Sequence, residues 1–452
     1  MLVVDEAAAI GTPMLTRWLD TFSRMVFSST VHGYEGSGQG FSLRFKQTLT
    51  KVMPQHRCLT LTKPIRWNEG DTVESFINTA FLLNADADDI DGYDVGRMAT
   101  SIGGAEQGDV ENGQSIRIRH WDRAELVKEK AVLTGLFGLL VTAHYKTTPG
   151  DLRNLLDGPN LDVFVATYHD GYTERVVGGL LLAKEGAFDD ELATSIWQGE
   201  RRPRGHLIPQ TLAVQCGYEG GLKHRSARII RIAVNPSIQQ RGLGKRLVEE
   251  AESYARQQGC EWLGSSFGAT EPLINFWGAC GLKPVRVGIS LDGVSGSYPT
   301  LVVAPLCEAV ESDFVLLRRR FHTHFLRALK NYYGNMSTEL LLCFLVRERE
   351  ESMASTPSVE TMEVQRDVDG FLQYQWPYDA VFPRLQDWFL GLLFTDNIIT
   401  HSDDISLLMD LFVRQQAIES AAKCWGKGGE KAFLKAVKTA ISNANDNASH
   451  LH

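Results

Sequence analysis

The stretch IRIAVNPSIQQRGLGK, residues 230–245, contains the clearest structural signal in the chain. Its first half is apolar at almost every position, as in a buried strand, and it ends at Asn235-Pro236 because proline cannot continue a strand ladder. Its second half places Gly242 and Gly244 directly before a helical pattern. Glycines there let the backbone approach a phosphate, and free amides at a helix start donate to phosphate oxygens. A tight turn with an ordinary helix cap is the alternative that these residues leave open.

The flanking residues extend this pattern on both sides. They predict a strand over residues 227–234 and a helix over residues 242–258, with Gly259 as its stop. Further on, FGATEPLINFWGACGL (residues 267–282) predicts a loop, a short helix and a second glycine stop. Together the two segments resemble motifs A and B of the GNAT N-acetyltransferases.

That resemblance implies acetyl-CoA as the cofactor. It implies that the pyrophosphate lies against motif A, which here consists of Gln239, Gln240, Arg241, Gly242, Leu243, Gly244 and Lys245. It also implies that a splayed strand offers backbone groups to the pantetheine arm, here from Ile232, Ala233 and Val234. In bacterial enzymes that this chain resembles, motif B contains a Glu that contacts CoA. The only acid in the corresponding segment here is Glu271, which stands next to Pro272 and is shifted by one position from the place of that Glu. We therefore expect cofactor recognition to depend mainly on the glycine turn.

Charge is unevenly distributed along the chain. The 452 residues carry a formal net charge of −9, yet residues 201–246 hold ten Lys or Arg against the single acid Glu219, a local +9. Residues 84–112 hold eight acids against only Arg97. A basic centre flanked by acidic segments favours an anionic ligand such as a nucleotide cofactor or RNA.

The N-terminus resembles part of a nucleotide hydrolase. The apolar run before Asp5 and Glu6 is typical of a Walker B strand, whose acids act on Mg²⁺ and on the attacking water. MVFSST (residues 25–30) predicts a second buried strand. A Walker A pattern, G-x-x-x-x-G-K-[ST], does not occur in the sequence, so we expect no phosphate cradle for ATP. A surface Asp-Glu pair after a short strand is the alternative.

Several further segments follow one another in an order that narrows the family. They are the Asp5-Glu6-Ala7-Ala8 run, VHGYEGSGQGFSLRF (31–45), PIRW (64–67), AHYKTTPGDL (143–152), RRPRGHLIPQ (201–210) and motif A. In this order they resemble the tRNA(Met) cytidine acetyltransferase (TmcA) family. The resemblance implies an ATP-dependent helicase-like module, a GNAT module and a tRNA-binding tail, which together make N4-acetylcytidine at the wobble position of elongator tRNA(Met). It implies nucleotide contacts by Asp5, Glu6 and Arg66, but ATP and Mg²⁺ binding is in doubt here because Walker A is missing.

We expect an α/β protein built from three parts and a linker. These are a partial P-loop (RecA/helicase-like) module at 1–85, an acidic linker at 86–120, a GNAT acetyltransferase fold at 121–306 and a helical tRNA-binding tail at 307–452. Breaks near residues 351–357 and 375–383 divide the tail, and lysines at 427, 431 and 435 are spaced to share one helical side.

The acceptor side of the chemistry depends on one histidine and one basic loop. His144 has a side chain suited to proton relay at neutral pH, and the resemblance also points to it; a histidine capping a helix end is the alternative. We interpret Arg201, Arg202 and Arg204 as RNA-backbone contacts, with an exposed solubilising loop as the alternative. Cytidine has to be unstacked to react, which suits an anticodon loop.

Other function classes are less favoured. The seven cysteines show no C-x-x-C spacing, so we expect no structural metal and no disulfide framework. No apolar run is long enough for a bilayer and no signal peptide is evident, so we expect no membrane and a cytoplasmic location. Two functions compete with RNA acetylation: acetylation of protein or small-molecule amines, and a non-catalytic RNA-binding remnant.

Overall fold

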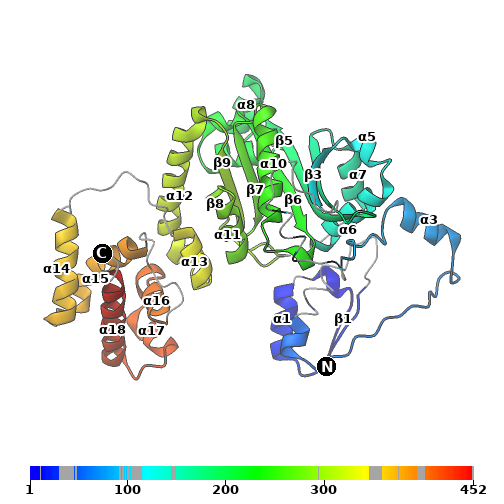
Figure 1. The fold of residues 1–452 in the computed structure, drawn as a ribbon. Helices are drawn as coiled ribbons and strands as arrows, with labels where there is room; N and C mark the ends of the chain where they lie inside the picture. The colour runs from blue at the N-terminus through cyan, green and yellow to red at the C-terminus, as the bar shows by residue number, and fades with distance from the viewer. Residues whose placement is uncertain are drawn as a thin grey trace. The chain divides into compact units, whose positions relative to one another are not determined.

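The computed structural model describes residues 1–10, 12–29, 45, 48–90, 93, 96, 98, 102, 115–143, 149–293, 295–345, 359–374, 376–393 and 403–449. By its internal contacts the chain divides into two compact units. The first comprises residues 1–268 and 276–315, and the second residues 269–275 and 316–452. The expected α/β class with a helical tail is confirmed (Figure 1).

A seven-stranded sheet forms the centre of the first unit, in the order β3-β4-β5-β6-β7-β9-β8. Only the β6–β7 pair is parallel; the other five pairings are antiparallel. The strands are β3 (Ser115–Trp121), β4 (Leu161–His169), β5 (Glu174–Gly186), β6 (Arg225–Val234), β7 (Trp262–Gly268), β8 (Lys283–Val287) and β9 (Pro299–Pro305). β4 and β5 are buried along most of their length because helices cover both faces of the sheet.

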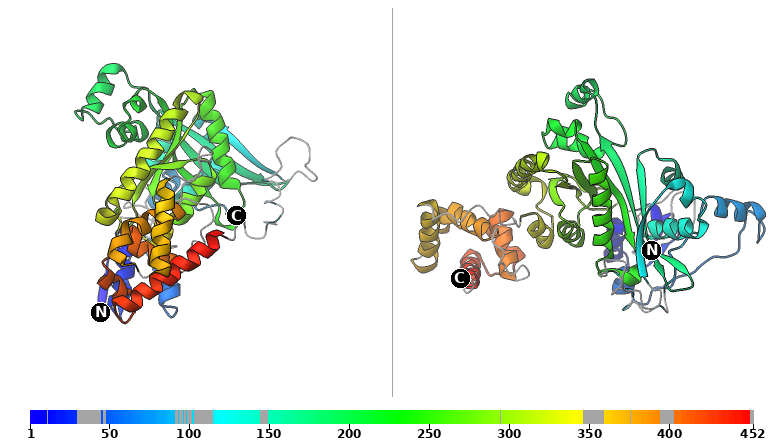
Figure 2. Two further views of the ribbon diagram at one scale, coloured as in Figure 1. Left: turned by 90° about the vertical axis from the view of Figure 1, so that its left-hand side faces the viewer. Right: turned by 45° about the horizontal axis from the view of Figure 1, so that its top comes forward.

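The two faces of the sheet carry separate hydrophobic cores. α6 (Lys130–Ala143) packs against one face of β5, in the core that includes Val176 and Leu181. α10 (Leu243–Gln257) packs against the other face, in the core that includes Leu180 and Leu182. Figure 2 shows these helices on opposite sides of the strands. Further α-helices around this sheet are α5 (Arg123–Leu126), α7 (Pro149–Asp157), α8 (Asp190–Trp197), α9 (Leu207–Gln210) and α11 (Glu271–Ala279), of which α11 begins in the second unit.

The expected acidic linker at 86–120 is wrong in its extent. β3 begins at Ser115 and pairs with β4 along its whole length, so the sheet starts inside the proposed linker. Ile90, Met98 and Ile102 are almost completely buried in the same core as α10. Burial of these apolar side chains stabilises the segment against the sheet, although its acids suggested a solvated connection.

The N-terminal elements form a small parallel β-α-β unit. β1 (Leu2–Val4) pairs with β2 (Met25–Phe27), and α1 (Thr12–Thr21) connects them. The prediction that this second strand is buried is wrong, since Val26 is 48% exposed and only one face of the pair packs against Leu15, Leu19 and Phe45. α3 (Thr72–Ala80) begins after Asp71, whose side chain accepts the amides of Val73 and Glu74.

The second unit is helical, as expected. Its helices are α12 (Glu311–Tyr332), which begins in the first unit, α13 (Thr338–Leu345), α14 (Val359–Gln373), α15 (Tyr378–Leu393), α16 (Asp403–Leu408), α17 (Ile418–Cys424) and α18 (Glu430–Ser449). Two details differ from the sequence pattern. Pro383 lies inside α15, so the break there is shorter than predicted. Lys427 precedes α18, so only Lys431 and Lys435 share a helical face. Within the described residues, no helix is long and apolar enough to cross a membrane.

Candidate active site

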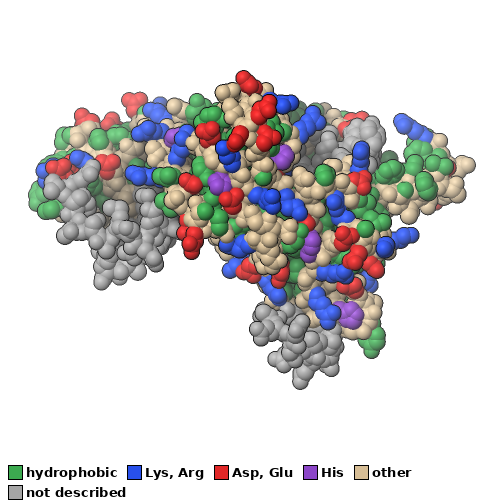
Figure 3. Space-filling model, turned by 90° about the horizontal axis from the view of Figure 1, so that it is seen from above, with side chains coloured by type: hydrophobic (Ala, Val, Ile, Leu, Met, Phe, Trp, Pro, Cys, Tyr) green, Lys and Arg blue, Asp and Glu red, His purple; other side chains and the backbone are tan. Residues whose placement is uncertain are grey.

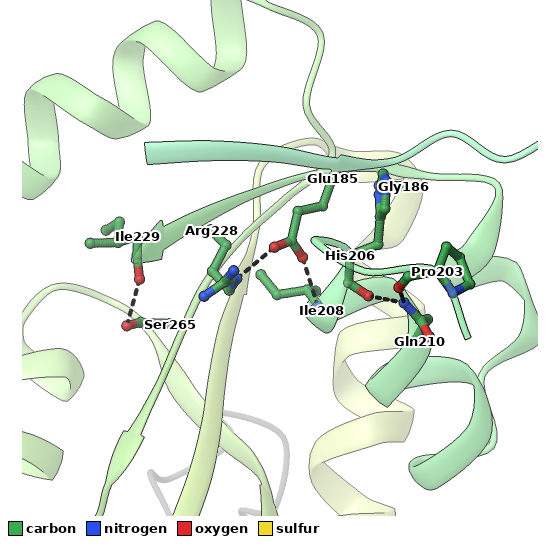
Figure 4. A network of polar contacts seen from close by, with 9 residues as sticks. All are labelled: Glu185, Gly186, Pro203, His206, Ile208, Gln210, Arg228, Ile229 and Ser265. Carbon is green, nitrogen blue, oxygen red and sulfur yellow. Dashed lines mark hydrogen bonds and ion pairs between the residues drawn. The ribbon is translucent and has the colours of Figure 1, made fainter. Parts of the chain in front are cut away.

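The central feature of the site is the divergence of the two parallel strands. β6 and β7 pair only from Ser226 to Ile229 on β6, although β6 continues to Val234. The Ser265 hydroxyl donates to the Ile229 carbonyl at 3.0 Å, at the last paired position (Figure 4). Beyond this point the edge of β6 that faces β7 has no strand partner among the described residues. Ile232, Ala233 and Val234 lie in this open stretch, where backbone groups are available to a ligand.

The glycine turn follows directly after the open end of β6. Gly242 is the N-cap of α10 with φ +91°, a left-handed conformation that favours glycine. Among the described residues, a Cβ at Gly242 would meet one atom within 4 Å, on Ile102 at 4.0 Å. The N-cap glycine has no side chain with which to cap the first amides of α10. Those amides and the helix dipole give the turn positive polarity, which suits an anion.

Side chains next to the turn fix its shape. Asn235 is buried, and its Oδ1 accepts the amide of Ser237 while its Nδ2 donates to the Asp88 carbonyl at 2.9 Å. The Gln239 side chain donates to the Val234 carbonyl at 2.9 Å, so its amide supports the turn. Gln240, which has φ +59°, is exposed. Arg241 and Lys245 are also exposed, and Leu243 is buried in the core.

The short helix of motif B also forms, as α11. Leu282 N–H donates to the Trp277 carbonyl, and Gly281 with φ +81° ends the helix as predicted. A Cβ on Gly244 would lie 3.1 Å from the Phe276 ring, so this glycine permits close packing of α10 against α11. Burial raises the pKa of the Cys280 thiol to about 11, against the opposing effect of the Lys245 ammonium. Glu271 is half-buried at the first position of α11.

A β-bulge in β6 places a cation beside the point of divergence. Leu181 pairs with Arg231 and Leu182 with Ile229, so Ile230 has no partner on β5. Arg231 forms an ion pair with Asp151 of α7, with 2.5 Å between Nη2 and Oδ1 and with both side chains largely buried. Asp151 belongs to the AHYKTTPGDL segment (143–152), so this ion pair joins the end of that segment to the bulge.

The basic loop at 201–206, called the arginine loop below, lies between α8 and α9. Arg201, Arg202 and Arg204 are exposed. By contrast, Arg228 of β6 is mostly buried and its Nε donates to the Oε1 of Glu185 at 2.6 Å (Figure 4). The opposite Glu185 oxygen accepts the amide of Ile208, the second residue of α9. The structure therefore connects the arginine loop to the sheet through a buried carboxylate.

The structure does not test the remaining predicted residues. His144 lies outside the described residues, as does almost all of the glycine-rich stretch 31–45. Asp5 and Glu6 are exposed after β1, with Glu6 at φ +48°. Arg66 is exposed in a segment without helix or strand. These assignments stay predictions.

Among the tail lysines, one has a structural role. Lys438 donates to the Phe371 carbonyl and lies over the Phe371 ring at 4.6 Å, which joins α18 to α14. Lys431 and Lys435 are exposed. On the face shown in Figure 3, acidic and basic side chains are interspersed, and no single continuous basic area is seen there.

Sequence reasoning missed Glu185, Asp151 and Arg231 as partners in the site. Glu185 carried a weak signal, as an acid near the end of a long apolar run. The partners are distant along the chain, 43 residues for Glu185 and Arg228 and 80 for Asp151 and Arg231, so only the sheet register reveals them. Among the described residues, no cluster of three or more His, Cys, Asp or Glu side chains is arranged to hold a metal ion.

Comparisons with known proteins agree with this architecture. The family model described as RNA cytidine acetyltransferase NAT10/TcmA, helicase domain, matches residues 1–84. The model described as GNAT acetyltransferase 2 matches residues 135–261, which include the divergent strands and the glycine turn. The tRNA(Met) cytidine acetyltransferase TmcA of Nitrosococcus halophilus is 40% identical over 347 residues, which are 77% of this chain and 44% of that protein. The chain belongs to the TmcA family.

Other TmcA relatives show the same partial correspondence. The TmcA of Vibrio cholerae is 38% identical over 303 residues, 67% of this chain and 39% of that protein. The chain thus spans less than half the length of these relatives. Among solved structures, NAA60 of Arabidopsis thaliana in complex with acetyl-CoA is 17% identical and covers 42% of this chain and 98% of that chain, with a TM-score of 0.29. A likeness at that TM-score supports no conclusion about this chain.

Proposed function

We propose that this chain transfers the acetyl group of acetyl-CoA to N4 of the wobble cytidine of elongator tRNA(Met). The observation that carries the proposal is the left-handed Gly242 at the uncapped start of α10, directly after the open end of β6. The TmcA relatives support the choice of substrate, since their names specify tRNA(Met) cytidine.

The residues present fit the cofactor. The left-handed turn at Gly242 and the amides of Leu243, Gly244 and Lys245, which the N-cap glycine cannot cap, suit a pyrophosphate. Arg241 and Lys245 add positive charge at the turn. On the edge of β6 that faces away from β5, Ile232, Ala233 and Val234 have no strand partner among the described residues, which suits the amide groups of a pantetheine arm. When bound, acetyl-CoA supplies the acetyl group as an activated thioester.

The protein must also hold the acceptor cytidine in line with the thioester. The lone pair of cytidine N4 is conjugated into the ring, so the amine is a weak nucleophile and alignment carries much of the catalysis. In our proposal Arg201, Arg202 and Arg204 bind the RNA backbone, and the tail supplies further contacts. His144 accepts the proton of the attacking amine, because an imidazole is largely neutral at pH 7. Glu271 contributes to cofactor binding from motif B.

The direct test is the acetylation of tRNA by the purified chain. Incubation with acetyl-CoA and tRNA should add an acetyl mass to one cytidine of tRNA(Met), read by mass spectrometry of nuclease fragments.

A second experiment tests the cofactor site. Gly242→Glu should abolish acetyl-CoA binding in calorimetry, because the carboxylate occupies the phosphate site with a like charge. Gly259→Glu is the matched control, since Gly259 has φ +69° at the other end of α10 and a Cβ there would meet no described atom within 4 Å. Its affinity for acetyl-CoA should stay at the parental value.

The role of His144 has its own outcome in the same assay. His144→Ala should bind both acetyl-CoA and tRNA normally and lose transfer by about 10²- to 10⁴-fold, the usual contribution of a general base. Acetylation at the parental rate would make the histidine structural only. If acetyl-CoA binds but no cytidine gains mass, acetylation of protein or small-molecule amines replaces the RNA assignment. If tRNA binds and acetyl-CoA does not, the chain is an RNA-binding remnant.

A further inference from the structure

The arginine loop is attached to the sheet at several points. Glu185, on β5, has a side chain with no exposed surface, and its two oxygens are shared between Arg228 of β6 and the Ile208 amide at 2.8 Å. Ile208 follows the loop by two residues. A single buried carboxylate therefore joins two strands of the sheet to the helix that ends the loop (Figure 4).

Further hydrogen bonds hold the loop from inside. The Gly186 amide donates to His206 Nδ1 at 3.0 Å. The side-chain amide of Gln210 donates to the carbonyls of Pro203 at 2.7 Å and of His206 at 2.6 Å (Figure 4). The backbone is thus fixed at both Pro203 and His206, and Arg204 lies between them.

The path of the chain below the loop is equally constrained. Gly186 has φ +84°, and a Cβ there would lie 2.2 Å from the His224 carbonyl oxygen, so only glycine fits. This close approach sets the end of β5 against the start of β6, where Glu185 is held. Glu185 and Gly186, called the anchor below, therefore belong to a constrained part of the sheet.

The three arginines of the loop differ from Arg228 and Arg231 of β6. Arg228 and Arg231 are paired with Glu185 and Asp151 and largely buried. For Arg201, Arg202 and Arg204 no ion pair is found among the described residues, and all three are exposed. Their charge is thus available to a ligand, and the backbone on both sides of Arg204 is held in place at Pro203 and His206.

A rigid array of charges recognises its ligand differently from a flexible one. Flexible basic segments bind any polyanion, because both partners adapt to one another. Charges on a fixed backbone bind best to phosphates whose spacing is already fixed, because little conformational freedom is then given up on binding. Folded RNA presents such phosphates, whereas single-stranded RNA has to be ordered first.

We propose that Glu185 is a specificity-determining positioning residue, which holds the arginine loop so that it prefers the backbone of a folded RNA over single-stranded RNA. This inference rests on the proposed function, in which the loop contacts tRNA. Glu185 touches no substrate itself and acts through the loop.

The experiment compares two RNA probes by fluorescence anisotropy. One is folded tRNA(Met), and the other is an unstructured RNA of the same length. The parental chain should prefer the folded probe by about tenfold or more, and Glu185→Gln should reduce that preference to about twofold, mostly through weaker tRNA binding. The salt slope of tRNA binding should fall by about one for each phosphate that the loop no longer neutralises. Acetyl-CoA affinity should not change.

Two further variants make the result decisive. Asp162→Asn is the matched control, because Asp162 is a buried acid of β4 that bonds Tyr254 of α10 and pairs with Lys184 of β5, and among the described residues no bond joins it to Glu185 or to the loop. It should retain the preference for folded RNA. If Glu185→Gln does not fold, Gln210→Met tests the same idea, since it removes the two internal hydrogen bonds of the loop and leaves the buried ion pair intact.

The binding measurements distinguish an error in the positioning role of Glu185 from an error in the proposed function. If Arg201→Glu and Arg204→Glu leave tRNA binding unchanged, the loop does not contact tRNA and that part of the proposed function is wrong. If those reversals weaken binding but both Glu185→Gln and Gln210→Met keep the parental preference, the positioning role of Glu185 is wrong and the RNA contacts stand. An equal reduction of the preference in Asp162→Asn would also overturn the positioning role.

Discussion

Cys280 shows how burial next to the glycine turn changes the chemistry of a single residue. Burial raises the pKa of its thiol from the usual value of 9.0 to about 11, even though Lys245 acts in the opposite direction. At pH 8 its thiolate fraction should therefore be about 100-fold smaller than that of an ordinary thiol. Exposed Cys58 should react with iodoacetamide faster by at least that factor, as measured by peptide mass spectrometry.

The raised pKa of Cys280 also makes the stability of the folded protein depend on pH. Because the folded pKa lies above the unfolded value, the protonated thiol contributes stability that is complete below pH 9 and is lost as the pH rises toward 11.

In the labelling experiment with iodoacetamide, exposed Cys424 serves as a second fast-reacting reference. Equal labelling of Cys280 and Cys58 in the native protein would contradict the buried position of Cys280.

At the scale of elements, the docking of α10 on the sheet determines where the glycine turn points. Leu247 has no exposed surface, and its Cδ1 lies 3.0 Å from the Cβ position of Gly178 on β5. Leu247→Ala should therefore lower the free energy of unfolding by about 2–5 kcal/mol, from reduced burial and the cavity that remains. Urea denaturation measures this change.

The matched control for that change lies on the same helix. Glu250 is exposed on α10, so Glu250→Ala should alter the free energy of unfolding by no more than about 0.5 kcal/mol. If Leu247→Ala proved as mild as Glu250→Ala, α10 would not be packed on β5 as described, and the direction of its N-terminus would be open again.

At the scale of the whole molecule, the nucleotide-hydrolase features are incomplete. Asp5 follows a strand that resembles Walker B, and β1 pairs with β2 as a parallel strand would in such a module. The sequence nevertheless contains no Walker A pattern, so we predict that this chain offers the phosphates of ATP no glycine cradle and no P-loop lysine. The purified chain should release no phosphate from ATP above background, with or without tRNA.

Asp5→Asn gives this expectation its control. The variant should match the parental chain in a phosphate-release assay, because the carboxylate has no bound nucleotide to act on. ATP turnover that disappears in Asp5→Asn would show that the prediction is wrong and that other residues form a nucleotide site.

Sequence alone determined the features that depend on neighbouring residues. The glycine turn, the helix that follows it and the stop at Gly259 were all predictable. Each follows from backbone conformations and hydrogen bonds within a few residues. The motif order also indicated the family, because those local patterns recur together.

Tertiary structure alone decided the features that join distant segments. The bulge at Ile230, the point at which β6 leaves β7 and the sharing of Glu185 between Arg228 and Ile208 depend on strand register. Register is set by how whole strands pack, and no local pattern encodes it. The acidic segment before β3 is the clearest case. Its charges predict a solvated linker, whereas the structure buries Ile90, Met98 and Ile102 in the core, where removal of their apolar surface from water is stabilising.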